Sequence, residues 1–174
     1  MRMRTLISLG LLAGLITAPA GAKAAQNSTT QSISASANVA GGISVARTQD
    51  LDFASLLSGT TAGSVTVSSS GTRSTTGGAS AVGGGFAPAS FQVSITQGNP
   101  HYSIQLPVGS VTLSGTGGSM LVDSFESTPG GPGFVGFAPG AGFQVMTVGA
   151  TLHVPANQAA GSYSGTFTVT VTQQ

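Results

Sequence analysis

Apolar and polar residues alternate one by one along much of this chain, most clearly close to its C-terminus. One side of the pattern there holds Tyr163, Phe167, Val169 and Val171, and serines and threonines occupy the other side. Successive side chains of a strand point to opposite faces of a sheet, so a period of two residues indicates a strand buried on one face. We therefore predict a core strand that ends the chain, with these four side chains directed inward.

Two internal segments, 91–95 and 102–106, show the same alternation. Gly98, Asn99 and Pro100 lie between them and are typical of a turn, so the two segments together predict a β-hairpin. Shorter alternating runs predict further strands at residues 64–68, 110–113, 120–125, 143–146 and 151–154.

An N-terminal alternating segment, residues 31–39, has smaller apolar side chains than the others. Its apolar positions are Ile33, Ala35, Ala37 and Val39, and polar residues lie between them. Such side chains bury little area, and at about 25 cal/mol per Å² they stabilise a sheet only modestly. The segment is therefore expected to be either a marginal edge strand or a strand that can be transferred.

The strand pattern also predicts the fold class. No stretch repeats apolar residues at the three- and four-residue spacing of a helix, and β-branched residues dominate the periodic segments. About eight to ten short strands favour antiparallel pairing, because parallel strands need long crossover connections. We expect an all-β, antiparallel immunoglobulin-like β-sandwich that forms one domain over residues 25–174. The segments 77–88 and 128–142, rich in glycine, alanine and proline, are expected to be loops.

The first 24 residues have the features of a secretory signal peptide. Arg2 and Arg4 precede an apolar run over residues 6–16, and small residues follow in the Ala-x-Ala pattern at 22–24. The apolar run is too short to span a bilayer, which takes about 20 residues. We therefore expect export by a Sec-type signal to the periplasm, the cell surface or the medium, with no membrane span.

Removal of the signal peptide changes the charge balance. It leaves two arginines against four acidic residues, a formal charge of −2, whereas the whole chain carries +1. Nucleic acids and anionic lipids are bound by clustered lysine and arginine, so neither is an expected partner. Cysteine is absent from the sequence, and stability must come from packing and sheet hydrogen bonds.

Few side chains of the mature part could support catalysis or hold a metal ion. Asp50 and Asp52 would share one face of a strand, but a calcium ion needs about six or more oxygen ligands, so solvated or turn-capping carboxylates are favoured. His101 and His153 have no evident acid partner in the sequence and are interpreted as surface histidines. Arg73 is expected to bond loop carbonyls or an acid such as Asp52, with an anionic ligand as the alternative. We assign no catalytic residue, cofactor or metal ligand, and an enzyme is not expected.

Several phrases in order along the chain resemble a family of secreted bacterial domains of unknown function, DUF4402. The resemblance covers roughly residues 31–172 and implies an immunoglobulin-like sandwich without an established activity. The phrases are Asp50-Leu51-Asp52-Phe53, Gly63-Ser64-Val65-Thr66-Val67, Gly71-Thr72-Arg73-Ser74, Tyr102-Ser103-Ile104-Gln105-Leu106-Pro107, Val148-Gly149-Ala150-Thr151-Leu152 and the closing segment 160–171.

The layout is also similar to that of spore coat protein U-like pilin subunits of archaic chaperone–usher fimbriae. In those subunits an alternating N-terminal segment supplies the strand that a neighbouring subunit lacks, and residues 32–39 stand in the corresponding place here. The chain departs from that pattern in having no cysteine pair, and Gln173 where tyrosine is frequent.

The resemblance implies a fimbria-like structural or adhesive protein that assembles by β-strand addition with itself, related subunits and a periplasmic chaperone. Two other classes stay open, a self-complete secreted or periplasmic binding module and, least favoured, an enzyme. In the first reading the strand-donor residues are Ile33, Ala35, Ala37 and Val39, and the acceptor strand contributes Tyr163, Phe167, Val169 and Val171.

Overall fold

The computed structural model of the 174-residue chain describes residues 29–40, 42–96, 101–130, 135–137 and 143–174. The predicted signal peptide and the predicted turn at 98–100 lie outside the described residues. Every helix or strand element of the described part is a strand, which confirms the all-β class. The strands are β1 (Thr29–Ala40), β2 (Ile43–Gln49), β3 (Leu51–Val67), β4 (Arg73–Gly83), β5 (Ala89–Ile95), β6 (His101–Gln105), β7 (Val111–Gly115), β8 (Gly118–Thr128), β9 (Val135–Phe137), β10 (Gln144–Val154) and β11 (Tyr163–Gln173).

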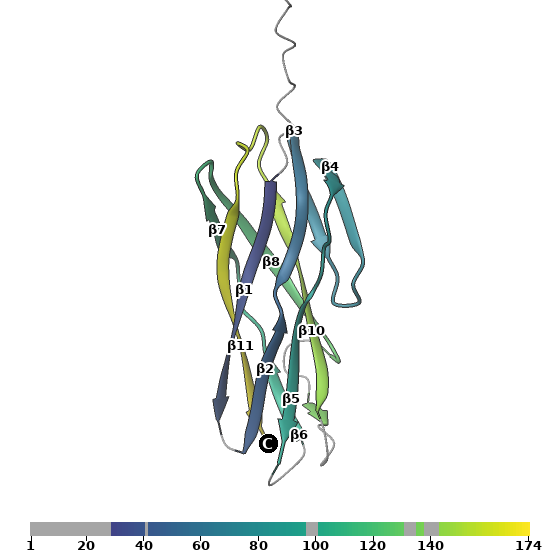
Figure 1. The fold of residues 1–174 in the computed structure, drawn as a ribbon, viewed down its shortest axis with the longest axis vertical. Coiled ribbons are helices and arrows are strands. Elements are labelled where there is room, and N and C mark those ends of the chain that lie inside the picture. Colours follow the sequence, from purple (N-terminus) through teal and green to yellow (C-terminus); the bar gives the residue numbers. More distant parts are fainter. Residues whose placement is uncertain (1–28, 41, 97–100, 131–134, 138–142) are drawn as a thin grey trace, which may run out of the picture.

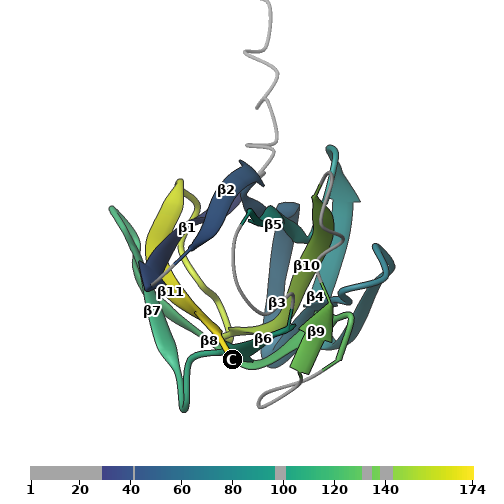
Figure 2. The same ribbon diagram turned by 90° about the horizontal axis from the view of Figure 1, so that it is seen from below.

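Six of these strands close into a barrel. Neighbours pair in the order β10, β8, β7, β11, β1 and β3, and pairing of β3 with β10 completes the ring. The other strands extend it: β5 and β2 follow from β10, β4 lies along β3, and β6 with β9 continues from β11. Figures 1 and 2 show the long strands running along the barrel and surrounding its interior. Apart from Ala54, the buried apolar side chains of the described residues form one core cluster.

The expected purely antiparallel sandwich needs correction at one pair of strands. β1 and β11 run parallel, in register from Gln31 opposite Tyr163 to Ala40 opposite Thr172. Parallel neighbours need a long connection, and here almost the whole domain lies between these two strands. Their pairing places the first and last strands side by side, and with the β3–β10 pairing it closes a ring where two separate sheets were expected.

Two long strands change neighbours along one edge. β3 pairs with β1 through residues 51–56 and with β10 through residues 63–67. β10 likewise pairs with β5 through residues 144–148 and then with β3 through residues 150–154. The two strands predicted within residues 143–154 are therefore one continuous strand.

The hairpin predicted for residues 91–106 is wrong, although both of its strands exist. β5 pairs with β2 and β10, whereas β6 pairs with β11 and β9. Alternation identifies a strand and its buried face, but it does not identify the neighbour. The inward side chains of β5 and β6 are buried beside different strands of the barrel.

The loop predicted over residues 77–88 is wrong for its first part, because β4 continues to Gly83. Glycine is required there by the close approach of two backbones. A Cβ atom on Gly78 would lie 2.0 Å from the carbonyl oxygen of Thr61, and one on Gly63 would lie 2.4 Å from that of Thr76. The predicted loop at 128–142 likewise contains the short strand β9.

Candidate functional site

The strand proposed as a donor lies between two strands of its own domain. β1 pairs in parallel with β11 over residues 31–40 and 163–172, and antiparallel with β3 over residues 29–33 and 51–56. We call β1 together with these facing residues of β11 and β3 the β1 seam. Figure 1 shows β1 lying between β11 and β3 on the barrel wall.

The inward face of β1 is the predicted one. Ile33 is fully buried, Ala35 is 7% exposed, and Ala37 is half-buried against the core. Val39 lies opposite Val171 in the backbone register, and its side chain is outside the described part. Gln31 is also buried, at 1% exposure, which the sequence analysis missed. Its position in the two-residue period was the available signal, and its polar side chain concealed it.

The facing side of the seam is built from buried residues of β11. The predicted acceptor residues Tyr163, Phe167, Val169 and Val171 are all at most 2% exposed. The Phe167 ring packs against the Phe125 ring with 5.1 Å between their centroids. The Tyr163 hydroxyl donates a hydrogen bond to the Ala159 carbonyl at 2.6 Å, which anchors the beginning of β11.

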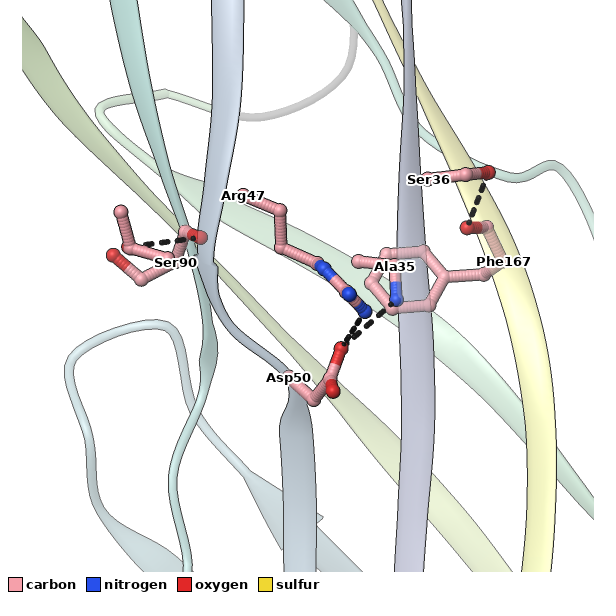
Figure 3. A network of polar contacts seen from close by, with 7 residues as sticks. Ala35, Ser36, Arg47, Asp50, Ser90 and Phe167 are labelled. Carbon is pink, nitrogen blue, oxygen red and sulfur yellow. Dashed lines mark hydrogen bonds and ion pairs between the residues drawn. The ribbon is translucent and has the colours of Figure 1, made fainter.

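Polar contacts hold β1 where its pairing with β3 ends. The Ala35 N–H donates to Asp50 Oδ1 at 3.3 Å, and Asp50 forms an ion pair with Arg47 of β2. Figure 3 shows contacts from the Asp50 carboxylate to both the Arg47 guanidinium and the Ala35 nitrogen. The Ser36 hydroxyl donates to the Phe167 carbonyl at 3.3 Å. The Asp50 carboxylate thus accepts a hydrogen bond from a backbone N–H of β1 that lies beyond the last residue of β1 paired with β3.

The structure separates the two aspartates that were considered for a cation. Asp50 contacts β1, whereas Asp52 Oδ1 accepts the N–H of Ala54 at 2.7 Å and so caps the bend at that residue. Among the described residues, no group of three or more histidine, cysteine, aspartate or glutamate side chains is placed to hold a metal ion.

This arrangement leads to a prediction about metal removal. We expect a chelator to leave the melting temperature of the mature protein unchanged, because the acidic side chains are engaged with backbone donors and a guanidinium group. Thermal unfolding followed by far-ultraviolet circular dichroism measures the melting temperature with and without chelator. The spectrum of the folded protein is expected to be dominated by β-structure. A large drop in melting temperature on chelation would show that a bound metal supports the fold.

The structure gives His153 an acid partner that the sequence did not reveal. His153 Nε2 and Asp123 Oδ1 are 2.9 Å apart across β10 and β8, and both side chains are well exposed. The hydrogen bond with His153 lowers the pKa of Asp123 below its ordinary value. His153 lines a surface groove of about 470 Å³ together with Leu121. His101 opens β6 and is exposed, as predicted.

Arg73 makes structural contacts with residues of the barrel wall and its neighbouring loop. Its guanidinium donates to the carbonyl of Phe53 at 3.2 Å and lies 4.7 Å from the centre of the Phe86 ring. Contact with loop carbonyls or with Asp52 was expected, whereas the carbonyl observed belongs to Phe53 within strand β3. A cation over an aromatic face is attracted by the ring quadrupole, so Arg73 joins β4 to two aromatic residues.

Comparison with known proteins assigns the chain to a family. A search of curated proteins gave no match. No helix in the described part of the chain is long and apolar enough to cross a membrane. Residues 43–172 match the family model described as domain of unknown function DUF4402, a match that begins at the first residue of β2 and leaves β1 outside. The chain therefore belongs to the DUF4402 family.

Proposed function

We propose that this protein is an exported, non-catalytic structural or adhesive protein, fimbria-like, that assembles by β-strand addition. The observation that carries the proposal is the β1 seam. β1 is an N-terminal strand with hydrogen-bonded neighbours on both sides, and the family-matched region begins just after it. A second copy could supply the same strand through main-chain hydrogen bonds and inward side chains.

The seam has the properties that strand addition needs. Without β1, the buried residues Leu51, Phe53 and Phe167 of β3 and β11 would border an open apolar groove. Such a groove is unfavourable in water and favours capture of a strand, from the same chain or another. Related subunits and a periplasmic chaperone are the further partners of this proposal, after export by the Sec-type signal.

A self-complete secreted or periplasmic binding module is the second candidate. The observation that favours it is that β1 occupies the seam within its own chain and is held there by the Asp50 and Ser36 contacts. Both candidate functions are compatible with a barrel derived from an immunoglobulin-like fold. Such a derivation is supported by the Tyr163 hydroxyl bonded to the backbone four residues upstream, which resembles the tyrosine corner of such folds.

Cysteine trapping separates the two candidates, since the sequence contains no cysteine. Ser36 and Thr168 are exposed partners in the β1–β11 register, and their hydroxyl oxygens are 3.1 Å apart. One copy of the full mature chain carries Ser36→Cys and another carries Thr168→Cys, and the two are unfolded, mixed, refolded and oxidised. Strand exchange is expected to give a disulfide-linked dimer of the two copies on a non-reducing gel.

A matched pair controls for random collisions. Ser36→Cys is mixed with Ser74→Cys, another exposed position, which lies on β4 and pairs with β3 and not with β1. A dimer yield no higher than in this control would contradict strand addition. The double variant Ser36→Cys/Thr168→Cys then tests pairing within one chain. If its disulfide forms within the monomer, the self-complete binding module replaces strand addition as the proposed function.

A further inference from the structure

Residue volumes alternate across the β1 seam. Ile33, fully buried, lies opposite Gly165, which has no side chain, and Ala35 lies opposite the buried Phe167. A large residue therefore meets a small one at two successive inward positions. The Phe167 ring is held in place by the Phe125 ring, so it has little room to move away from β1.

Gly165 cannot be replaced by a larger residue without steric clashes. A Cβ atom there would lie 2.6 Å from the carbonyl oxygen of Thr112 and 2.9 Å from the side chain of Leu113. The small residue at this position of β11 is thus imposed by the close approach of β7, its antiparallel neighbour. The bulk needed to cover the core at this level is supplied by Ile33 from β1.

A second contact marks the same place along β1. The Ala35 N–H reaches the Asp50 carboxylate, which Arg47 positions from β2 (Figure 3). Ala35 is consequently recognised twice, by its backbone donor and by the small size of its side chain opposite Phe167. A shift of β1 by two residues along β11 would bring Ile33 opposite Phe167 and overpack that position.

We propose a register code: a large residue at position 33 followed by a small residue at position 35 determines the register in which β1 pairs with β11 in the β1 seam. The seam then selects this chain's own N-terminal strand, and in assembly the β1 of a second copy, over strands with other volume orders. This partner assignment rests on the proposed function. The code itself also applies when β1 pairs within its own chain.

The test exchanges the two volumes without changing the composition of the strand. Ile33→Ala/Ala35→Ile is introduced into the copy that carries Ser36→Cys, and the copy that carries Thr168→Cys is left otherwise unchanged. We expect the yield of disulfide-linked dimer to fall at least about tenfold, as expected for overpacking opposite Phe167. Ser34→Ile is the matched control, because it adds bulk to β1 on its exposed face and should leave the yield unchanged.

A compensating pair keeps the test valid if the exchanged strand prevents folding. Ala35→Ile in the donor copy combined with Phe167→Ala in the acceptor copy restores a large residue opposite a small one. We expect this combination to recover more dimer than Ala35→Ile alone. An exchanged donor that cross-links as well as the unchanged one, or a compensating pair that recovers nothing, would overturn the register code.

The same variants distinguish failure of the code from failure of strand addition. In the single-chain variant Ser36→Cys/Thr168→Cys, exchange of the volumes at positions 33 and 35 should also slow the disulfide within the monomer. If that slowing is observed while unchanged donor and acceptor copies give no dimer above the control, the register code stands and strand addition is refuted.

Discussion

Phe167→Ala is expected to destabilise the protein by about 3–5 kcal/mol, the usual cost of removing a buried phenylalanine ring. The ring is 2% exposed, lies mid-strand in β11 and packs against Phe125 and opposite Ala35. Because Ala35 is small, no neighbour on β1 can fill the cavity that the substitution leaves. Denaturant unfolding at equilibrium measures the loss, which is a large fraction of the roughly 5–15 kcal/mol that stabilise a domain.

The adjacent residue provides the control for this prediction. Thr168 points away from the core and shares a hydroxyl contact with Ser36 on the exposed face of the sheet. Thr168→Ala should therefore cost well under about 1 kcal/mol. Similar losses for the two variants would mean that the inward and outward faces of β11 are assigned incorrectly.

Gly149→Val is expected to destabilise the protein by more than about 3 kcal/mol, beyond the usual range for overpacking. Gly149 lies where β10 leaves β5 and joins β3. A Cβ atom there would be 2.4 Å from both the Val67 carbonyl oxygen and the Ser69 nitrogen. The backbone at Ser69 cannot withdraw easily, because its N–H donates to Glu126 at 2.8 Å and its carbonyl accepts from Thr147 at 2.7 Å.

The control for Gly149 is a glycine with open space around it. A Cβ atom on Gly85 would meet no heavy atom within 4 Å, and its backbone is outside the left-handed region. Gly85→Ala should leave the melting temperature within a few degrees of the unchanged protein. A Gly149→Val variant as stable as Gly85→Ala would show that β3 and β10 do not cross as closely as described.

Local alternation was sufficient to find most of the strands. β11 and β5 were predicted with their buried faces, because their buried side chains are apolar and the side chains between them are polar. The inward face of β1 followed for the same reason. Gln31 was missed because burial of a polar side chain depends on neighbours that lie far away in the sequence.

The candidate site was only partly visible in the sequence. The donor and acceptor residues could be named from their period, but the contact of Asp50 with Ala35 joins positions 15 apart, and that of His153 with Asp123 joins positions 30 apart. No local pattern encodes such distances, since each contact exists only after strands from different parts of the chain have paired. The closed ring has the same origin, because the β3–β10 and β1–β11 pairings are both long-range.

By itself, the sequence determined the all-β class, the family and the apolar residues of β1, β5 and β11 that face the core, because these depend on side-chain chemistry and a two-residue period. Only the tertiary structure decided which strands are neighbours, that β1 runs parallel to β11, and that the glycines of β4 lie in a strand. The physical reason is that strand pairing satisfies backbone hydrogen bonds that all residues share, so the choice of partner is made by packing over the whole barrel.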